Sequence, residues 1–107
     1  MNNMEHLTFE FGPYPRRPQE AATVLVGVVG SGNMEALCEP AALDGRMRVV
    51  VHSSVRGFDA TWKAVVSDFA ARVQVPDLIV TINDAGATPA VVALRLAQAA
   101  AELGAAA

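Results

Sequence analysis

The spacing of apolar residues changes twice between positions 46 and 83, and this change strongly limits the fold. From 46 to 52 apolar residues alternate with other residues, as in a strand that is buried on one face. From 58 to 73 they follow helical spacing, with Asp59 as the expected N-cap, and from 78 to 83 they alternate again. This order predicts a right-handed strand–helix–strand unit whose two strands are parallel.

Three further segments extend this unit. Thr23–Val29 is apolar on both faces, which predicts an interior strand that is covered on each side. Residues 34–39 form another strand-like run. Thr88 and Pro89 are residue types typical of an N-cap and a first helical position, so a second helix is expected from here to Gly104.

The two ends of the chain have weaker patterns. Residues 6–11 alternate weakly and predict a short edge strand, and residues 12–20 contain three prolines, which favour a surface loop. We therefore divide the chain into an edge strand and Pro-rich loop (1–22), a main domain (23–104) and a tail expected to fray (105–107).

These elements predict an α/β (α+β) fold with one domain, since the chain has 107 residues. Two amphipathic helices on one face of a four-stranded mixed sheet would form a two-layer sandwich. The pattern leaves the strand order open.

Composition excludes several classes of protein. The eight Lys and Arg residues are scattered and the net charge is −3, which disfavours binding to nucleic acid. Cys38 is the single cysteine, so no intrachain disulfide can form and a reducing compartment is expected. The N-terminus lacks an apolar signal core and no apolar run approaches about 20 residues, so we expect a cytoplasmic protein that does not enter a membrane.

Gly30-Ser31-Gly32-Asn33 separates two strand-like runs and predicts a hairpin turn with an accessible serine hydroxyl at its tip. A plain turn is one interpretation. A phosphate-binding loop is a second, but the motif lacks the Walker lysine and leads into a strand. A nucleophile elbow is a third interpretation, but it needs glycine two residues before and two residues after the serine, where this chain has Val29 and Asn33, so it fails. The absence of a neighbouring base favours a serine that another enzyme modifies.

Other candidate residues lie at two strand-to-helix junctions. Ser53 and Ser54 begin one junction and Asp84 lies in the other, where each could form a turn or cap, or border a ligand. His6 and His52 are the only imidazoles, and a catalytic role beside Ser31 would need one of them close by. A zinc site is disfavoured because one cysteine and two histidines give too few ligands.

Four pieces of the chain form an ordered set: Val26–Glu35, Ser53–Phe58, the helix start at Thr61-Trp62, and Thr81–Pro89 continuing into Val92–Leu96. In this order they resemble the acyl carrier (delta) subunits of malonate decarboxylase. The resemblance extends from about residue 23 to residue 103, and Asn33 stands where relatives often have an acidic residue.

The resemblance implies that Ser31 carries 2'-(5''-phosphoribosyl)-3'-dephospho-coenzyme A through a phosphodiester, on a turn supported by Gly30, Gly32 and Asn33. The terminal thiol of this phosphopantetheine-like arm would carry acetyl, which is exchanged for malonyl, and decarboxylation would regenerate acetyl. The implied partners are the acetyl-carrier:malonate transferase subunit, the malonyl-carrier decarboxylase subunits and a prosthetic-group transferase. The carrier itself would be non-catalytic, with Ser53, Ser54 and Asp84 as candidate contacts of the arm or of partners.

Alternative functions are a citrate lyase-type acyl carrier, which uses the same kind of group, a subunit-binding module without a covalent group, and a hydrolase or transferase with Ser31 as its nucleophile. The common four-helix acyl carriers are excluded, because the chain lacks their Asp-Ser-Leu motif and has too few helices. An apolar strand face without helices could serve for docking to partners, and its expected residues are Leu25, Leu37, Val50 and Ile79.

Overall fold

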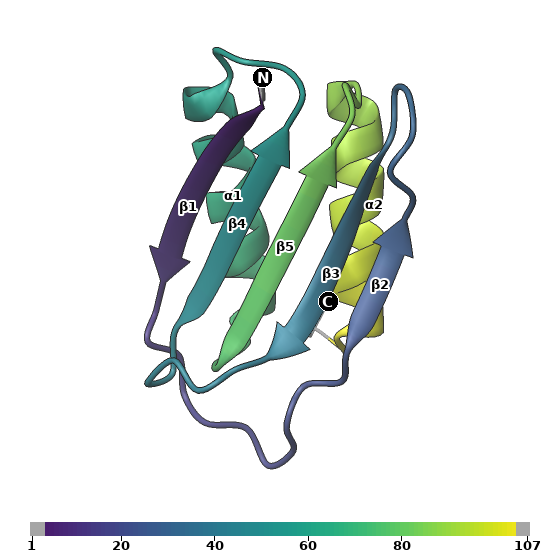
Figure 1. Cartoon of the computed structure of the whole chain (residues 1–107). Helices are drawn as coiled ribbons and strands as arrows, with labels where there is room; N and C mark the ends of the chain where they lie inside the picture. Colours follow the sequence, from purple (N-terminus) through teal and green to yellow (C-terminus); the bar gives the residue numbers. More distant parts are fainter. Residues whose placement is uncertain (1–3, 105–107) are drawn as a thin grey trace.

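A computed structural model describes residues 4–104 and shows a single sheet with two helices packed on one face (Figure 1). The sheet has five strands in the order β1-β4-β5-β3-β2. Their bounds are Glu5–Phe11 (β1), Val24–Gly27 (β2), Met34–Pro40 (β3), Met47–Ser53 (β4) and Leu78–Asp84 (β5). The helices are α1 (Asp59–Val73) and α2 (Pro89–Glu102).

The strand–helix–strand prediction is confirmed. Strand β4 leads through α1 into β5, and the two strands are parallel neighbours, with Met47 opposite Leu78 and Ser53 opposite Asp84. All other neighbouring strands are antiparallel, so the sheet is mixed. The two-layer α+β architecture with both helices on one face is therefore confirmed (Figure 1).

The predicted number of strands was too low by one. The N-terminal strand β1 pairs with β4 along its whole length, from Glu5 opposite Ser53 to Phe11 opposite Met47. Its weak alternation is explained by its position, because an edge strand at the margin of the helical layer is only partly covered. Every described residue of β1 is intermediate or exposed.

The prediction that Thr23–Val29 forms an interior strand was wrong. Strand β2 has only four residues and lies at the opposite edge of the sheet from β1. One face of it packs on α2 through Val24 and Val26, while Leu25 on the other face is 59% exposed. The chain is apolar on both faces here although only one face is covered.

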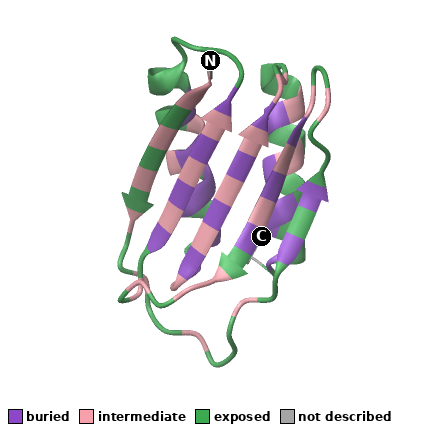
Figure 2. Cartoon of the chain, in the orientation of Figure 1, coloured by how far each residue is buried: buried purple, intermediate pink, exposed green. Residues whose placement is uncertain are grey.

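The core lies between the sheet and the helices. Buried and partly exposed residues alternate along β3, β4 and β5, as expected for strands covered on one side (Figure 2). Helix α2 packs on β2 and β3, helix α1 lies on the β1 side of the sheet, and the two helices contact each other. The largest fully buried side chains include Met34, Met47, Leu78 and Ile82.

The observed ends of the helices agree only in part with those predicted from the sequence. Thr88 caps α2 as predicted, since its side chain accepts a hydrogen bond from the backbone N–H of Val91, and Pro89 follows at the first helical position. The predicted cap of α1 was wrong by one residue. Phe58 occupies the N-cap position without a side-chain hydrogen bond, and Asp59 lies in the first turn. The predicted frayed tail, 105–107, lies outside the described residues.

Candidate functional site

Ser31 lies at the tip of the loop that joins β2 to β3. The backbone N–H of Asn33 donates to the carbonyl of Gly30 at 2.9 Å, which closes a four-residue turn with Ser31 in its second position. Gly32 occupies the third position with a φ of +72°, a conformation that type II turns require and that glycine adopts without strain. Ser31 is exposed, and its hydroxyl makes no hydrogen bond to any residue in the range 4–104.

The connection is longer than the tight hairpin that the sequence predicts, because β2 ends at Gly27 and β3 begins at Met34. It is nevertheless fixed at its base. The N–H of Gly32 donates to the carbonyl of Ala85 at 2.8 Å, and the N–H of Ala85 donates to the carbonyl of Asn33 at 2.9 Å. These two hydrogen bonds attach the serine turn to the loop between β5 and α2.

Asn33 supports the turn from the side of α2. Its side-chain oxygen accepts a hydrogen bond from the N–H of Met34 at 2.8 Å and another from Nε of Arg95 at 3.1 Å. Gly27 makes room for this arrangement, because a Cβ at this position would lie 2.1 Å from the carbonyl oxygen of Met34 and 2.9 Å from Cδ of Arg95. The predicted turn residues are therefore brought together, with Arg95 as an addition.

Sequence reasoning missed the position of Arg95, although the residue belongs to one of the segments that carry the resemblance. Its second hydrogen bond goes to the neutral side chain of Gln98, and no carboxylate among residues 4–104 forms an ion pair with it. A positive charge without an acidic partner thus lies beside the serine turn. Helical spacing alone could not reveal this, because it depends on how α2 packs on β2 and β3.

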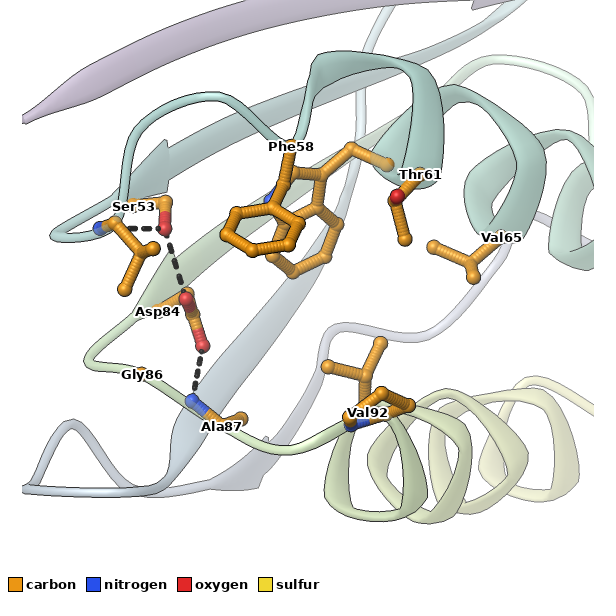
Figure 3. Close-up of a pocket in the computed structure, with 11 residues that line it drawn as sticks. Ser53, Phe58, Thr61, Val65, Asp84, Gly86, Ala87 and Val92 are labelled. Carbon is orange, nitrogen blue, oxygen red and sulfur yellow. Dashed lines mark hydrogen bonds between the residues drawn. The ribbon is translucent and has the colours of Figure 1, made fainter.

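Ser53 and Asp84 are joined to each other at the ends of the two parallel strands. Oγ of Ser53 donates to Oδ2 of Asp84 at 2.8 Å, and Oδ1 of Asp84 accepts from the N–H of Ala87 at 2.9 Å (Figure 3). Oγ of Ser53 also accepts from the N–H of Val55. Both side chains are buried, with 1% and 5% exposure, so neither can form part of a flat surface that contacts a partner directly. Ser54 differs in being exposed.

An apolar cavity of about 290 Å³ lies between the first turns of α1 and α2. Figure 3 shows the ring of Phe58 between the Ser53–Asp84 pair on one side and Val65 and Val92 on the other. The residues lining the cavity also include Val55, Thr61, Trp62, Gly86, Ala87 and Pro89. The lining thus includes the buried carboxylate of Asp84, and Gly86 and Ala87 belong to the same loop that holds the serine turn.

The histidines do not form a catalytic site with Ser31. His6 and His52 lie opposite each other on β1 and β4, and their Nδ1 atoms are 2.6 Å apart. Strand β5 separates β4 from β3, so His52 is two strands away from the strand that follows the serine turn. Within residues 4–104 there is also no group of three His, Cys, Asp or Glu side chains that could hold a metal ion.

The face of the sheet opposite the helices carries the four residues expected there. Leu25, Leu37, Val50 and Ile79 are all exposed or partly exposed and lie between the buried positions of their strands.

Cys38 lies on the other face of the sheet, where it is fully buried under α2. Burial together with the charge of Glu102 raises its thiol pKa to about 12. Neither described helix is long and apolar enough to cross a bilayer.

Sequence comparison finds one matching family and several similar proteins. A family model described as the malonate decarboxylase delta subunit (MdcD) matches residues 21–103. A malonate decarboxylase acyl carrier protein of Stenotrophomonas maltophilia (strain K279a) is 52% identical over 96 residues, which cover 90% of this chain and 91% of the relative. One from Burkholderia cepacia is 52% identical over 100 residues, covering 94% and 91%.

Comparison with solved structures leads to the same family as the comparison of sequences. A chain in the crystal structure of a Pseudomonas malonate decarboxylase hetero-tetramer in complex with malonate superposes with a TM-score of 0.77. It is 40% identical in sequence, and the match covers 94% of this chain and 99% of that chain. The extent of the family match and the identity to these relatives show that this chain belongs to the malonate decarboxylase delta subunits, a family of acyl carrier proteins.

Proposed function

We propose that this chain is the acyl carrier subunit of a malonate decarboxylase and that Ser31 is the attachment residue for 2'-(5''-phosphoribosyl)-3'-dephospho-coenzyme A. The observation that carries the proposal is the free hydroxyl of Ser31, exposed at the tip of a turn that five hydrogen bonds hold in place. A nucleophile would need a base, and the Ser31 hydroxyl has no hydrogen-bond partner among residues 4–104. An attachment point needs only access and a fixed position.

The residues around Ser31 suit a large phosphodiester. Oγ of Ser31 would provide the ester oxygen, and a Cβ added at Gly30 or Gly32 would meet nothing within 4 Å, so the space beside the serine is open. The guanidinium of Arg95, which has no acidic partner among the described residues, lies on the far side of Asn33 and would favour a negative charge at the turn. When attached, the group supplies a thiol that carries acetyl or malonyl as a thioester.

The chain itself contributes position rather than catalysis. A serine fixed on a rigid turn holds the start of a long tether in one place, and tethering keeps an acyl group near partner active sites at an effective concentration on the order of millimolar. The proposed partners are an acetyl-carrier:malonate transferase, malonyl-carrier decarboxylase subunits and a prosthetic-group transferase, in the cytoplasm. The hetero-tetrameric assembly of the Pseudomonas enzyme supports the existence of partner subunits.

The proposal is tested by expressing the wild type, Ser31→Ala and Ser54→Ala together with the modifying enzymes. Ser54 is a matched control because it is also an exposed serine and directly follows β4, whose end lies at the same end of the sheet as the β2–β3 loop (Figure 1). We expect the intact masses of the wild type and Ser54→Ala to increase by one prosthetic group, and that of Ser31→Ala to stay unchanged. Ser31→Ala should keep the far-UV circular dichroism of the wild type, because its side chain contacts nothing that the fold needs.

Release of CO₂ from malonate by the reconstituted complex provides the functional measurement. The complex that contains Ser31→Ala should be inactive. Near-normal activity with Ser31→Ala would contradict the proposal and would favour a module that binds its partner subunits without a covalent group. A mass increase in Ser31→Ala would show that another residue is modified.

A further inference from the structure

We propose that the cavity between the first turns of α1 and α2 binds the adenine ring of the group attached to Ser31. This inference rests on the proposed function and adds a binding site on the carrier itself. It assigns a role to the Ser53–Asp84 pair and to Phe58, which the attachment of the group does not explain. Three properties of the cavity support it: its position, its lining and its size.

The position of the cavity follows from the hydrogen bonds of the serine turn. Gly32, the neighbour of Ser31, donates to the carbonyl of Ala85 at 2.8 Å, and Gly86, the next residue along, lines the cavity. Standard bond lengths along this path limit the distance between the Cα atoms of Ser31 and Gly86 to about 10 Å. The serine turn and the cavity therefore lie close together, at the end of the molecule where the β2–β3 loop and the first turns of both helices are found (Figure 1).

The attached group is long enough for its adenine to reach the cavity. Adenine is joined to Oγ of Ser31 through one phosphate and two ribose rings, a path of about nine bonds that spans roughly 12 Å when extended. The thiol lies beyond a diphosphate and the pantetheine chain, which more than doubles the path. Adenine bound in the cavity would leave the thiol free to reach the active sites of partners.

The lining of the cavity suits a flat aromatic base with a polar edge. Phe58 is 51% exposed, an unusual position for a large aromatic side chain, and Trp62 lies in the wall beside it. Aromatic side chains stack on nucleobases, whatever the base, because every base has a flat π-face. Each carboxylate oxygen of Asp84 accepts one hydrogen bond and can accept a second, which the exocyclic amino group of adenine can donate.

The size of the cavity favours a single ring system. Its volume of about 290 Å³ is at the lower limit of ligand pockets, which are typically about 300–1,000 Å³. The whole prosthetic group would not fit. One base, with its riboses and phosphates in solvent, is the part of the group that both the volume and the lining accommodate.

NMR spectroscopy of the full-length loaded carrier tests this proposal, after intact mass has shown that the group is attached. We expect nuclear Overhauser effects from the adenine H2 and H8 protons to the side chains of Phe58 and Val92. Phe58→Ala should lose them, and because Phe58 is exposed the variant should stay folded. Leu94→Ala is the matched control: Leu94 is 50% exposed on α2, does not line the cavity, and its variant should keep these effects.

Fluorescence gives a second measurement, since Trp62 is the only tryptophan of the chain. Its emission should change on loading in the wild type and in Leu94→Ala but not in Phe58→Ala. A loaded protein whose adenine signals match those of free dephospho-coenzyme A would overturn the assignment while leaving the proposed function intact. Contacts of Phe58 to the pantetheine methyl groups or to a labelled acetyl group would also overturn it. A protein that stays unloaded would refute the proposed function, and this inference with it.

Discussion

The hydrogen bond between Ser53 and Asp84 should couple the two parallel strands at the end where the candidate site lies. Ser53→Ala, Asp84→Ala and the double variant form a thermodynamic cycle that isolates this bond. The pair is suited to the test because both side chains are buried and each also binds a backbone N–H, that of Val55 or that of Ala87.

The expected magnitudes follow from the bonds that each variant loses. Ser53→Ala should lower the free energy of unfolding by about 2 kcal/mol, because Oδ2 of Asp84 remains buried without its partner. Asp84→Ala should lower it by about 4 kcal/mol, because two hydrogen bonds to a charged acceptor, each contributing about 1.5–3 kcal/mol, are lost. Since both variants remove the shared bond, the double variant should cost about 1–2 kcal/mol less than the sum of the two.

Urea unfolding followed by far-UV circular dichroism measures these free energies. Ser67→Ala on α1 is the matched control, because the hydroxyl of this serine makes no hydrogen bond within residues 4–104, and it should change the free energy by less than about 0.5 kcal/mol. If Asp84→Ala unfolds the protein, Asp84→Asn replaces it in the cycle. Additivity of the two single variants within about 0.5 kcal/mol would refute the coupling.

Three further predictions concern other positions. Gly27→Ala should lower the free energy of unfolding by more than about 2 kcal/mol, because the added Cβ collides with the carbonyl of Met34 and the backbone is strained at positive φ. Gly57 also has a positive φ but has open space around it, so Gly57→Ala should lower this free energy by only about 1 kcal/mol in the same urea assay. Cys38, whose pKa burial raises to about 12, should not react with Ellman's reagent at pH 8 until urea unfolds the chain, so the loaded native protein should show one reactive thiol, that of the arm. Backbone hydrogen bonds from Gly45 and Leu43 lower the pKa of Asp77, so Asp77→Asn should lower the thermal midpoint at pH 7. The difference from the wild type should begin to shrink as the pH falls below the ordinary Asp pKa of about 4, and it should vanish below the lowered pKa of the folded state.

The parts of the fold that the sequence predicted best are those where burial is one-sided and regular. Strands β4 and β5 alternate strictly because one face packs on the helices, and α1 between them has a helical stripe that includes Trp62 and Phe69. Parallel pairing of the two strands then follows from the connection by one helix. The same local signals placed Thr88 and Pro89 correctly at the start of α2.

The errors occurred at the edges of the sheet. An edge strand has a partner on one side only, so its alternation is weak, as in β1, or is replaced by residues that are apolar on both faces, as in β2. Leu25 and Val24 look alike in the sequence, yet only Val24 is covered by a helix. Local spacing does not contain this information, because it depends on strand order.

The serine turn at the centre of the candidate site could be predicted from the sequence, but the residues that surround the turn could not. Ser31, Gly30 and Gly32 form a turn because of their own backbone preferences, which are local. Arg95 reaches the turn only through the packing of α2, and the cavity requires the first turns of two helices that are far apart in the chain. Ser53 and Asp84 were identified as candidates, but their mutual hydrogen bond depends on the parallel pairing of β4 and β5.

The most direct test of the account is the location of the covalent group, measured by tandem mass spectrometry of the tryptic peptide 17–46 from the loaded wild-type protein. Trypsin releases this peptide intact because Arg17 is followed by proline, and Ser31 is the single serine within it. We predict that the entire mass gain of one phosphoribosyl-dephospho-coenzyme A lies on this peptide and fragments to Ser31. Recovery of the unmodified peptide from a loaded protein, with the added mass elsewhere in the chain, would contradict the role of the serine turn as the anchor.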